Sequence, residues 1–266
     1  MKVGLLSDSH LLSESWLDHI DSMLPSNQVD VMVLLGDIGS HGFIPDVCIY
    51  VQEKLKCDVI FVPGNHDYYS YLYYVMTKKS IEQLWRKKTK HNSKIHILID
   101  KSVTINGVDF FGSTWWSGLG GDEHAEEFAK VSKSFSDFRF IITSIGYESG
   151  YFRTKYFDPD EMIKLNKKAI RAYKKWRINS KSEKRVLCAH FPMLDFMRNP
   201  NFKDSYYFNG VDDKVLLAHP PDYILFGHIH WNLESIEKGI YCASNMHGLK
   251  GEVGNIGFNK EFLIDI

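Results

Sequence analysis

The stretch Cys57-Asp-Val-Ile-Phe-Val-Pro-Gly-Asn-His-Asp67 joins a run of apolar, β-branched residues to a polar loop. A short apolar run of this composition predicts a buried strand. The loop that follows, Gly64 to Asp67, reads Gly-Asn-His-Asp and is rich in side chains that bind metals or move protons. In α/β proteins, loops at the carboxyl ends of strands carry ligands and catalytic groups. The stretch therefore predicts a central strand with a functional site at its end.

The same arrangement recurs along the chain. Further apolar runs predict strands within residues 2–8, 29–37, 94–99, 108–114, 185–191, 222–228 and 239–244. Together with the first run these make eight, and the apolar part of five of them leads directly into Asp, Asn or His. Helical patterns lie between them at residues 13–24, 44–56 and 157–176. Strands that alternate with helices predict an α/β fold built on a mostly buried sheet or pair of sheets.

The segment 157–176 is the clearest predicted helix. Asp158 can serve as its N-cap, Pro159 stands at the first helical position, and Glu161 can close a capping box. One face is apolar, and the opposite face carries basic residues from Lys164 to Lys175. Such a basic face usually marks a solvated surface, but it could also contact a nucleic-acid backbone.

Residues 113–157 follow a looser pattern, rich in glycine and aromatic residues, without clear strand alternation. We interpret this segment as a lid-like insertion over one face of the core, since long irregular segments inside compact domains are often functional. The chain, residues 1–266, is thus expected to form a single domain.

Composition excludes several classes of protein. The chain of 266 residues is 44% hydrophobic and 24% charged, with a formal net charge of −1, so no overall charge attracts it to nucleic acid or to an anionic membrane. No apolar run approaches the roughly 18 residues of a membrane span. The four cysteines show no C-x-x-C spacing and read as reduced structural thiols. We expect a cytoplasmic protein without a membrane partner or an evident obligate protein partner.

The polar residues at the predicted strand ends form an ordered set whose side-chain types are those of metal ligands. They are Asp8, His10, Asp37, Asn65, His66, His190, His228 and His230. Carboxylate, amide oxygen and imidazole suit Mn²⁺, Fe or Zn²⁺. The pairs Asp8/His10 and His228/His230 are spaced i, i+2, which places both side chains on one side of an extended strand. The alternative is a set of unrelated structural polar residues.

As an ordered set, Asp8-Ser9-His10, Gly36-Asp37, Gly64-Asn65-His66-Asp67, His190 and Gly227-His228-Ile229-His230 resemble the motifs of the calcineurin-like metallophosphoesterases. Their form is similar to that of the cyclic-nucleotide phosphodiesterase-like branch of bacterial phosphohydrolases. The resemblance implies a four-layer αββα sandwich, in which two mixed sheets are flanked by helices.

The resemblance also implies a role for each matching residue. One metal ion would be held by Asp8, His10 and His230, a second by Asn65, His190 and His228, and Asp37 would bridge the two. His66 would donate a proton to the leaving oxygen, and Asp67 would orient His66. Manganese is the expected metal, with Fe, Zn and Ni as alternatives.

The expected activity is hydrolysis of a small phosphate ester, as a phosphodiesterase or phosphomonoesterase on a nucleotide or similar substrate, by attack of a metal-bridging hydroxide. A nuclease acting on DNA or RNA is the alternative. Protein phosphatase activity is less expected because Ser40 and His41 stand where the family's protein phosphatases carry Asp and Arg. An inactive scaffold is also less expected, since neither the ligands nor the candidate acid are lost.

Substrate contacts are expected from aromatic and histidine residues near the motifs. The candidates are Tyr68, Tyr69, Trp115, Trp116, His41 and His247. A tyrosine here could stack on a base or aryl group. The competing interpretation is that the tyrosines between Tyr68 and Tyr74 pack as core beneath the insertion.

Overall fold

The computed structural model describes residues 1–11, 15–71, 75–119, 135–148, 150–197, 213–249, 251–252 and 256–266. In these residues one sheet has the strand order β13-β1-β2-β3-β4. Its strands are β1 (Lys2–Leu6), β2 (Val31–Leu35), β3 (Asp58–Val62), β4 (Ile95–Ile97) and β13 (Leu263–Asp265). Strands β1 to β4 run parallel to one another, and β13 pairs antiparallel with β1.

A second sheet has the strand order β11-β12-β10-β9-β6-β5. Its strands are β5 (Lys101–Ile105), β6 (Val108–Ser113), β9 (Lys184–Ala189), β10 (Tyr223–Phe226), β11 (Glu234–Glu237) and β12 (Ile240–Ala243). The inner strands β6, β9, β10 and β12 are parallel, whereas β5 and β11 are antiparallel edges. Both sheets are therefore mixed, as expected from the resemblance.

An apolar core fills the space between the two sheets. Val33 and Ile60 of the first sheet belong to the same buried cluster as Phe110, Val186 and Leu225 of the second. Strand residues of the opposite parity pack outward against helices, because side chains alternate between the faces of a strand. Leu34, for example, shares its cluster with helical residues.

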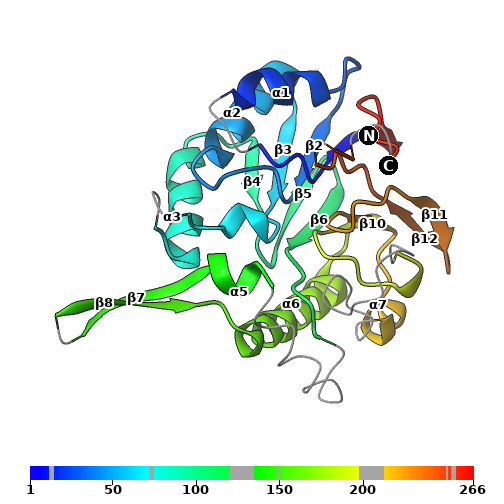
Figure 1. Cartoon of the computed structure of the whole chain (residues 1–266). Coiled ribbons are helices and arrows are strands. Elements are labelled where there is room, and N and C mark those ends of the chain that lie inside the picture. Colours follow the sequence, from blue (N-terminus) through cyan, green and yellow to red (C-terminus); the bar gives the residue numbers. More distant parts are fainter. Residues whose placement is uncertain are drawn as a thin grey trace.

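Helices cover both outer faces and complete the four layers (Figure 1). The first sheet carries α1 (Trp16–Met23), α2 (Ile44–Leu55) and α3 (Lys78–Thr89), and the second carries α6 (Pro159–Asn179) and α7 (Asp213–Ala218). The predicted αββα sandwich is thus confirmed. The predicted cap of α6 is also present, since the Asp158 side chain accepts a hydrogen bond from the Glu161 N–H at 2.9 Å.

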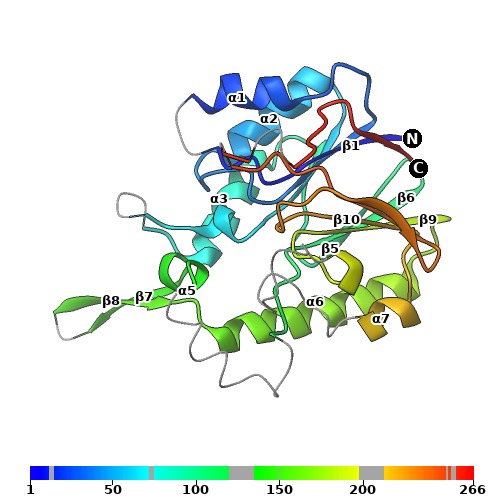
Figure 2. The same ribbon diagram turned by 45° about the vertical axis from the view of Figure 1, so that its right-hand side comes forward.

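The insertion differs from expectation. It contains the short helix α5 (Asp137–Phe140) and a hairpin formed by β7 (Ile142–Glu148) and β8 (Tyr151–Tyr156), where no strand was predicted. Most of the hairpin has both faces in solvent, so its sequence lacks the apolar alternation of a strand with one buried face. It projects away from the core in both views (Figures 1 and 2). Residues 120–134 of the insertion lie outside the described residues.

The four cysteines are buried and unpaired, which confirms their interpretation as structural thiols. None of the helices in the described residues combines the length and apolar character that crossing a membrane requires.

Candidate metal centre

Strands of both sheets deliver the predicted ligands to one region. The chain leaves β1, β2 and β3 at Asp8, Asp37 and Asn65, and it leaves β9 and β10 at His190 and His228. Within each sheet these strands are parallel, so their carboxyl ends lie at the same edge. Three groups of acidic and histidine side chains have ligand atoms that all lie within 4.8 Å of one another: Asp8, His10 and His230; His10, Asp37 and His66; and Asp37, His190 and His228.

The backbone at this edge is strained. Five of the seven predicted ligands have left-handed backbone, with φ of 54° at Asp8, 47° at His10, 52° at Asp37, 76° at His228 and 46° at His230. Non-glycine residues in this region cost on the order of 1–3 kcal/mol each and cluster at functional sites. The surrounding fold therefore holds these side chains in orientations that isolated loops would not favour.

The first group converges on a point between Asp8, His10 and His230. The Nε2 atoms of His10 and His230 are 3.2 Å apart, and His230 Nε2 lies 3.5 Å from an oxygen of Asp8. The other ring nitrogen of His230, Nδ1, lies 2.5 Å from Glu252. The carboxylate accepts a hydrogen bond from the N–H at Nδ1, which holds the proton there and leaves the lone pair of Nε2 for a cation. Glu252 belongs to none of the motifs, and the sequence interpretation missed it.

The second group converges between Asp37, Asn65 and His190. His190 Nδ1 lies 3.0 Å from the carbonyl oxygen of Leu35, to which it can donate, and this leaves Nε2 facing the site. His190 Nε2 lies 3.5 Å from Asp37 Oδ2 and 3.2 Å from Asn65 Oδ1. His228 completes the group, and its ring stacks on Phe191 with centroids 3.9 Å apart.

Asp137 decides how the Asn65 amide is turned. Its Oδ1 atom accepts hydrogen bonds from Asn65 Nδ2 at 2.8 Å and from the Tyr69 hydroxyl at 2.5 Å. An ionised carboxylate only accepts hydrogen bonds, so the amide N–H₂ must face Asp137 and the amide oxygen must face His190. Asp137 is fully buried and comes from α5 of the insertion. No sequence motif marks this residue, so the sequence interpretation missed it.

Asp67 does not orient His66, which corrects the expectation. Its Oδ1 accepts hydrogen bonds from the N–H groups of Ile38 and Gly39, and its Oδ2 accepts from those of Asp37 and Gly64, at 2.8–3.1 Å. These four bonds occupy the four lone-pair positions of the carboxylate. The role of Asp67 is instead to join the loop after β2 to the loop after β3 and so to place Asp37.

His66 lies at the mouth of the cluster. Its side chain is 41% exposed, compared with 0% for His190, and its Nε2 lies 4.0 Å from Asp37 Oδ2. Its backbone N–H donates to Asp37 Oδ1 at 2.8 Å, and its ring stacks on Tyr69 with centroids 4.3 Å apart. An imidazole in this place can exchange protons with a molecule that arrives from solvent.

The electrostatics of the cluster favour cations. Asp8 and Asp37 are each at most 2% exposed, and their ion-pair partners in the described residues are histidines. Buried carboxylates need compensating charge. Burial lowers the pKa of His190, but the Asp37 carboxylate more than offsets this effect and raises it to about 9, so this part of the cluster attracts positive charge. Burial lowers the pKa of His10 to about 4, which leaves a neutral ligand nitrogen. The donor set therefore fits two divalent ions.

Comparison with known proteins agrees with this geometry. A sequence profile described as calcineurin-like phosphoesterase matches residues 1–232. The chain belongs to the calcineurin-like phosphoesterase family. It is a metal-dependent phosphohydrolase that acts on phosphate esters, as the family and the convergent His and Asp groups show.

Similar proteins are distant. The phosphoesterase is 25% identical to the uncharacterized protein L509 of Acanthamoeba polyphaga mimivirus, over 98% of this chain and 95% of that protein. Among solved structures it resembles the phosphopantetheinyl hydrolase PptH from Mycobacterium tuberculosis, with a TM-score of 0.70, 14% identity and coverage of 94% and 90% of the two chains. A dimetal phosphatase from Danio rerio aligns with a TM-score of 0.48, 13% identity and coverage of 92% and 86%.

Most of the expected substrate contacts of the phosphoesterase lie elsewhere. Tyr68 and Trp115 are 0% exposed and Trp116 is 4% exposed, so these rings are core residues rather than stacking platforms. Tyr68 packs on Trp85 and Trp116, which favours the interpretation that this tyrosine is core. Tyr69 is also buried, but it touches the site through His66 and Asn65. Tyr73 and Tyr74 lie outside the described residues.

The two remaining histidine candidates do not join the ligand groups found in the described residues. His41 is buried, and its carbonyl accepts a hydrogen bond from Trp85. His247 is half-buried after β12, where its ring packs edge-on against Phe258. Both predictions of substrate contact therefore lack support from the geometry of the described residues.

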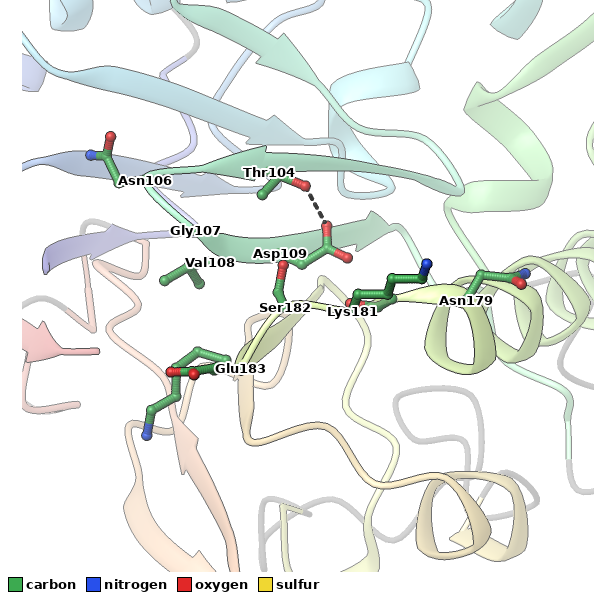
Figure 3. Close-up of a pocket in the computed structure, with 11 residues that line it drawn as sticks. Thr104, Asn106, Gly107, Val108, Asp109, Asn179, Lys181, Ser182 and Glu183 are labelled. Carbon is green, nitrogen blue, oxygen red and sulfur yellow. Dashed lines mark hydrogen bonds between the residues drawn. The ribbon is translucent and has the colours of Figure 1, made fainter.

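A large open pocket of the phosphoesterase lies apart from the ligand cluster. It is lined by the beginning of β6 and the residues before β9, including Asn106, Asp109, Asn179 and Glu183 (Figure 3). The predicted ligands follow the opposite ends of such strands, since His190 comes after β9. This pocket therefore does not contribute to the candidate metal centre.

Proposed function

We propose that this phosphoesterase uses two metal ions, manganese in the first instance, to hydrolyse a small phosphate ester whose leaving group carries an aromatic ring, such as the base of a nucleotide or an aryl group. The observation that carries the proposal is the convergence of two ligand groups, one around Asp8 and one around His190, with Asp37 close to both. A carboxylate that lies between two cation positions can act as a ligand of both ions.

Asp8, His10 and His230 would hold one ion, and Asn65, His190 and His228 the other, with Asp37 shared. Bound there, the ions would supply positive charge for the phosphoryl oxygens and lower the pKa of a water molecule so that it can act as a nucleophile. The chain itself orients these ligands from behind. Glu252, Asp137 and the Leu35 carbonyl each contact the side of a ligand that faces away from the ion positions.

His66 is suited to give a proton to the leaving oxygen. It is the most exposed imidazole beside Asp37, and the backbone bond to Asp37 together with the stacked Tyr69 ring keeps it at the mouth of the site. A general acid must reach the leaving oxygen from the solvent side of the phosphorus atom, and His66 occupies that side.

Two aromatic side chains near His66 support an aromatic leaving group. Tyr71 is 48% exposed, Phe140 is half-buried, and both pack against Tyr69. The Tyr69 ring lies between Tyr71 and His66, since it stacks on His66 and packs edge-on against Tyr71. Their rings can stack on a base or aryl group. Tyr71 and Phe140 thus take the role first expected of Tyr68.

The test is an assay of metal-stripped protein reloaded with Mn²⁺ on p-nitrophenyl phosphate and bis-p-nitrophenyl phosphate. We expect no activity without metal, a loss of about 10²–10⁴-fold in kcat for His66→Ala, and an unchanged rate for the matched control His19→Ala, an exposed histidine on α1. Preference for the diester would assign a phosphodiesterase, and preference for the monoester a phosphatase. Full activity of the stripped protein or of Asp37→Asn would overturn the proposal.

The same preparation tests whether the enzyme prefers aromatic leaving groups. Tyr71→Ala should raise KM for nucleoside and p-nitrophenyl esters about 10-fold, as expected for a lost stacking contact, and leave KM for glycerol phosphate unchanged. An equal change in KM for the aromatic esters and for glycerol phosphate would contradict the aromatic subsite. It would not contradict metal-dependent hydrolysis. Cleavage of single-stranded oligonucleotides with a steep salt dependence would instead favour the nuclease.

A further inference from the structure

The β7–β8 hairpin carries an apolar surface that the described residues leave uncovered. The two strands pair in register, with Tyr147 opposite Phe152 and Ile145 opposite Thr154. Cross-strand partners point to the same side of a ribbon, and residues two apart do so as well. One side, here called the apolar face, therefore presents Ile145, Tyr147, Phe152, Thr154 and Tyr156.

The opposite side of the ribbon is polar. Lys155 stands opposite Ser144 and Arg153 opposite Gly146, and Arg153 lies 3.4 Å from the Glu148 carboxylate. Tyr151 near the tip is the aromatic residue of this side. The hairpin is thus amphipathic across its thickness, which is the pattern of a ribbon with one face to bury and one to solvate.

The exposure of the apolar face is large. Ile145 is 41% exposed, Tyr147 70%, Phe152 80% and Tyr156 45%. Tyr147 and Phe152 touch each other edge-on at 5.3 Å between ring centroids. Contiguous exposed apolar residues of this kind usually mark an interaction surface, and a two-stranded ribbon is only marginally stable in water without further packing.

The hairpin is held firmly at its base and extends freely beyond it. At the base, Ile142 forms a bridge with Thr77, and the Phe157 N–H donates to the Ile141 carbonyl. Beyond the base the ribbon extends away from both sheets and their helices (Figures 1 and 2). A second molecule can therefore approach the apolar face without obstruction from the described parts of the same chain.

We propose that the apolar face of the hairpin packs against the same face of a second copy of this chain, which gives a symmetric dimer. Complete burial removes about 150–250 Å² from an aromatic side chain, so the four exposed residues offer roughly 500 Å² per copy. With the face fully buried, two copies together reach ~1,000 Å², which is the lower limit for a specific interface. A two-fold axis needs a self-complementary patch, and an apolar face without charges meets this condition.

The placement of charge disfavours other occupants. Arg153 and Lys155 lie on the side opposite Tyr147 and Phe152, and Glu148 lies near the tip. A membrane surface or a single-stranded nucleic acid would need basic residues beside the aromatic ones. The net charge of −1 provides little repulsion between copies. A dimer keeps both polar faces in solvent.

Sedimentation velocity of the full chain tests the proposal. We expect a dimer at micromolar concentrations. The double variant Tyr147→Ser, Phe152→Ser should have a dimer dissociation constant at least 10-fold higher than that of the wild type. The matched control Arg153→Ser, Lys155→Ser alters the opposite face and should remain dimeric. A wild-type chain that is monomeric at every concentration up to about 1 mM, or double variants that dissociate equally, would overturn the proposal, as would a monomer that binds vesicles or oligonucleotides through this face.

A labelling experiment tests the dimer with single substitutions in place of the double variants. All four native cysteines are buried, so a cysteine introduced on the hairpin is selectively accessible to a bulky maleimide. Thr154→Cys lies on the apolar face and should react more slowly as the protein concentration rises. Lys155→Cys lies on the polar face and should react at a constant rate. Equal behaviour of the two variants contradicts the dimer. Neither experiment depends on phosphatase activity, so the inference stands or falls separately from the proposed function.

Discussion

Asp137 shows how a single buried side chain can control a metal ligand that it does not replace. Its Oδ1 atom accepts a hydrogen bond from the Asn65 amide on the side away from His190. The same oxygen accepts a hydrogen bond from the Tyr69 hydroxyl. The Tyr69 hydroxyl also accepts from the Asn65 amide at 3.3 Å. The three groups form a closed triangle in which each hydrogen bond has one possible direction, so the amide oxygen points toward the ion position.

Replacing Asp137 by Asn should release the Asn65 amide, because an amide at residue 137 can donate as well as accept and no longer excludes the flipped orientation. We expect Asp137→Asn to weaken Mn²⁺ binding at one of two sites by about 10–100-fold and to lower kcat more than KM. Calorimetric titration of the stripped protein with Mn²⁺ measures this.

The matched control is Asp160→Asn, an exposed aspartate in the first turn of α6. It should bind two ions with wild-type affinity. Two unchanged sites in Asp137→Asn, in a protein with an unchanged melting temperature, would show that the triangle does not orient the ligand.

Glu252 should play the corresponding part at the other site. Its carboxylate lies 2.5 Å from His230 Nδ1, and the change Glu252→Gln replaces a charged acceptor by a neutral amide. We expect weaker Mn²⁺ binding by about 10-fold at the site of Asp8 and His10. Glu183→Gln, an exposed residue before β9, provides the control. Loss of affinity at the Asn65 site instead would contradict this assignment.

The loops at the strand ends require backbone conformations and close contacts that only particular residues allow. Gly36, between β2 and Asp37, has φ of +79°, and a Cβ atom there would lie 2.4 Å from His190 Nδ1 and 2.5 Å from the Gly64 nitrogen. The loop after β2, the loop after β3 and the ligand after β9 are thus in direct contact. This closeness explains why the glycines of the motifs stand beside the ligands.

The change Gly36→Ala should therefore destabilise the fold by about 2 kcal/mol or more, from the positive φ together with the collision, and should displace His190. Gly107→Ala is an informative control, because its φ is +83° but nothing lies within 4 Å of the added Cβ. Urea unfolding separates the two contributions. Equal losses in both variants would mean that the contact with His190 costs nothing.

The central strands were predictable from sequence, and three of the four edge strands of the two large sheets were not. All eight predicted strands are present, from β1 with its buried Leu5 to β12 with its buried Cys242. Besides the hairpin strands β7 and β8, the missed strands are the edges β5, β11 and β13, which have at most one buried residue each. The edge strand β4 was predicted, and two of its three residues are buried. A strand with a neighbour on one side only needs no continuous apolar run, so its sequence resembles that of a loop.

The buried negative charge links the fold to its metals. Burial lowers the pKa of His230, but Asp8 and Glu252 outweigh this effect and raise it to about 9, as Asp37 does for His190. A histidine with a raised pKa stabilises the fold fully below about pH 6.5, its unfolded pKa. This contribution is lost as the pH rises through the folded value of about 9.

We therefore expect the melting temperature of the metal-stripped protein to fall between pH 6.5 and 9.5. The Mn²⁺-loaded protein should keep its melting temperature over the same range, because metal binding uses the deprotonated imidazoles. Scanning calorimetry with EDTA or Mn²⁺ measures both curves of melting temperature against pH. The control His19→Ala should not change the difference in melting temperature between them. Parallel curves with and without metal would contradict the coupling.

Apolar strands and the polar residues at their ends are local patterns, so the sequence by itself predicted an α/β fold and a cluster of side chains suited to metals. The αββα sandwich and the assignment of ligands to two ions were implied by the resemblance of the ordered motifs to a known family. The direction of the Asn65 amide, the four backbone contacts of Asp67 and the burial of Tyr68 were not predictable in this way. Each depends on segments far apart in the chain, such as α5 meeting the loop after β3. Neighbours in space, which packing brings together, decide whether a tyrosine is core and which group an aspartate binds.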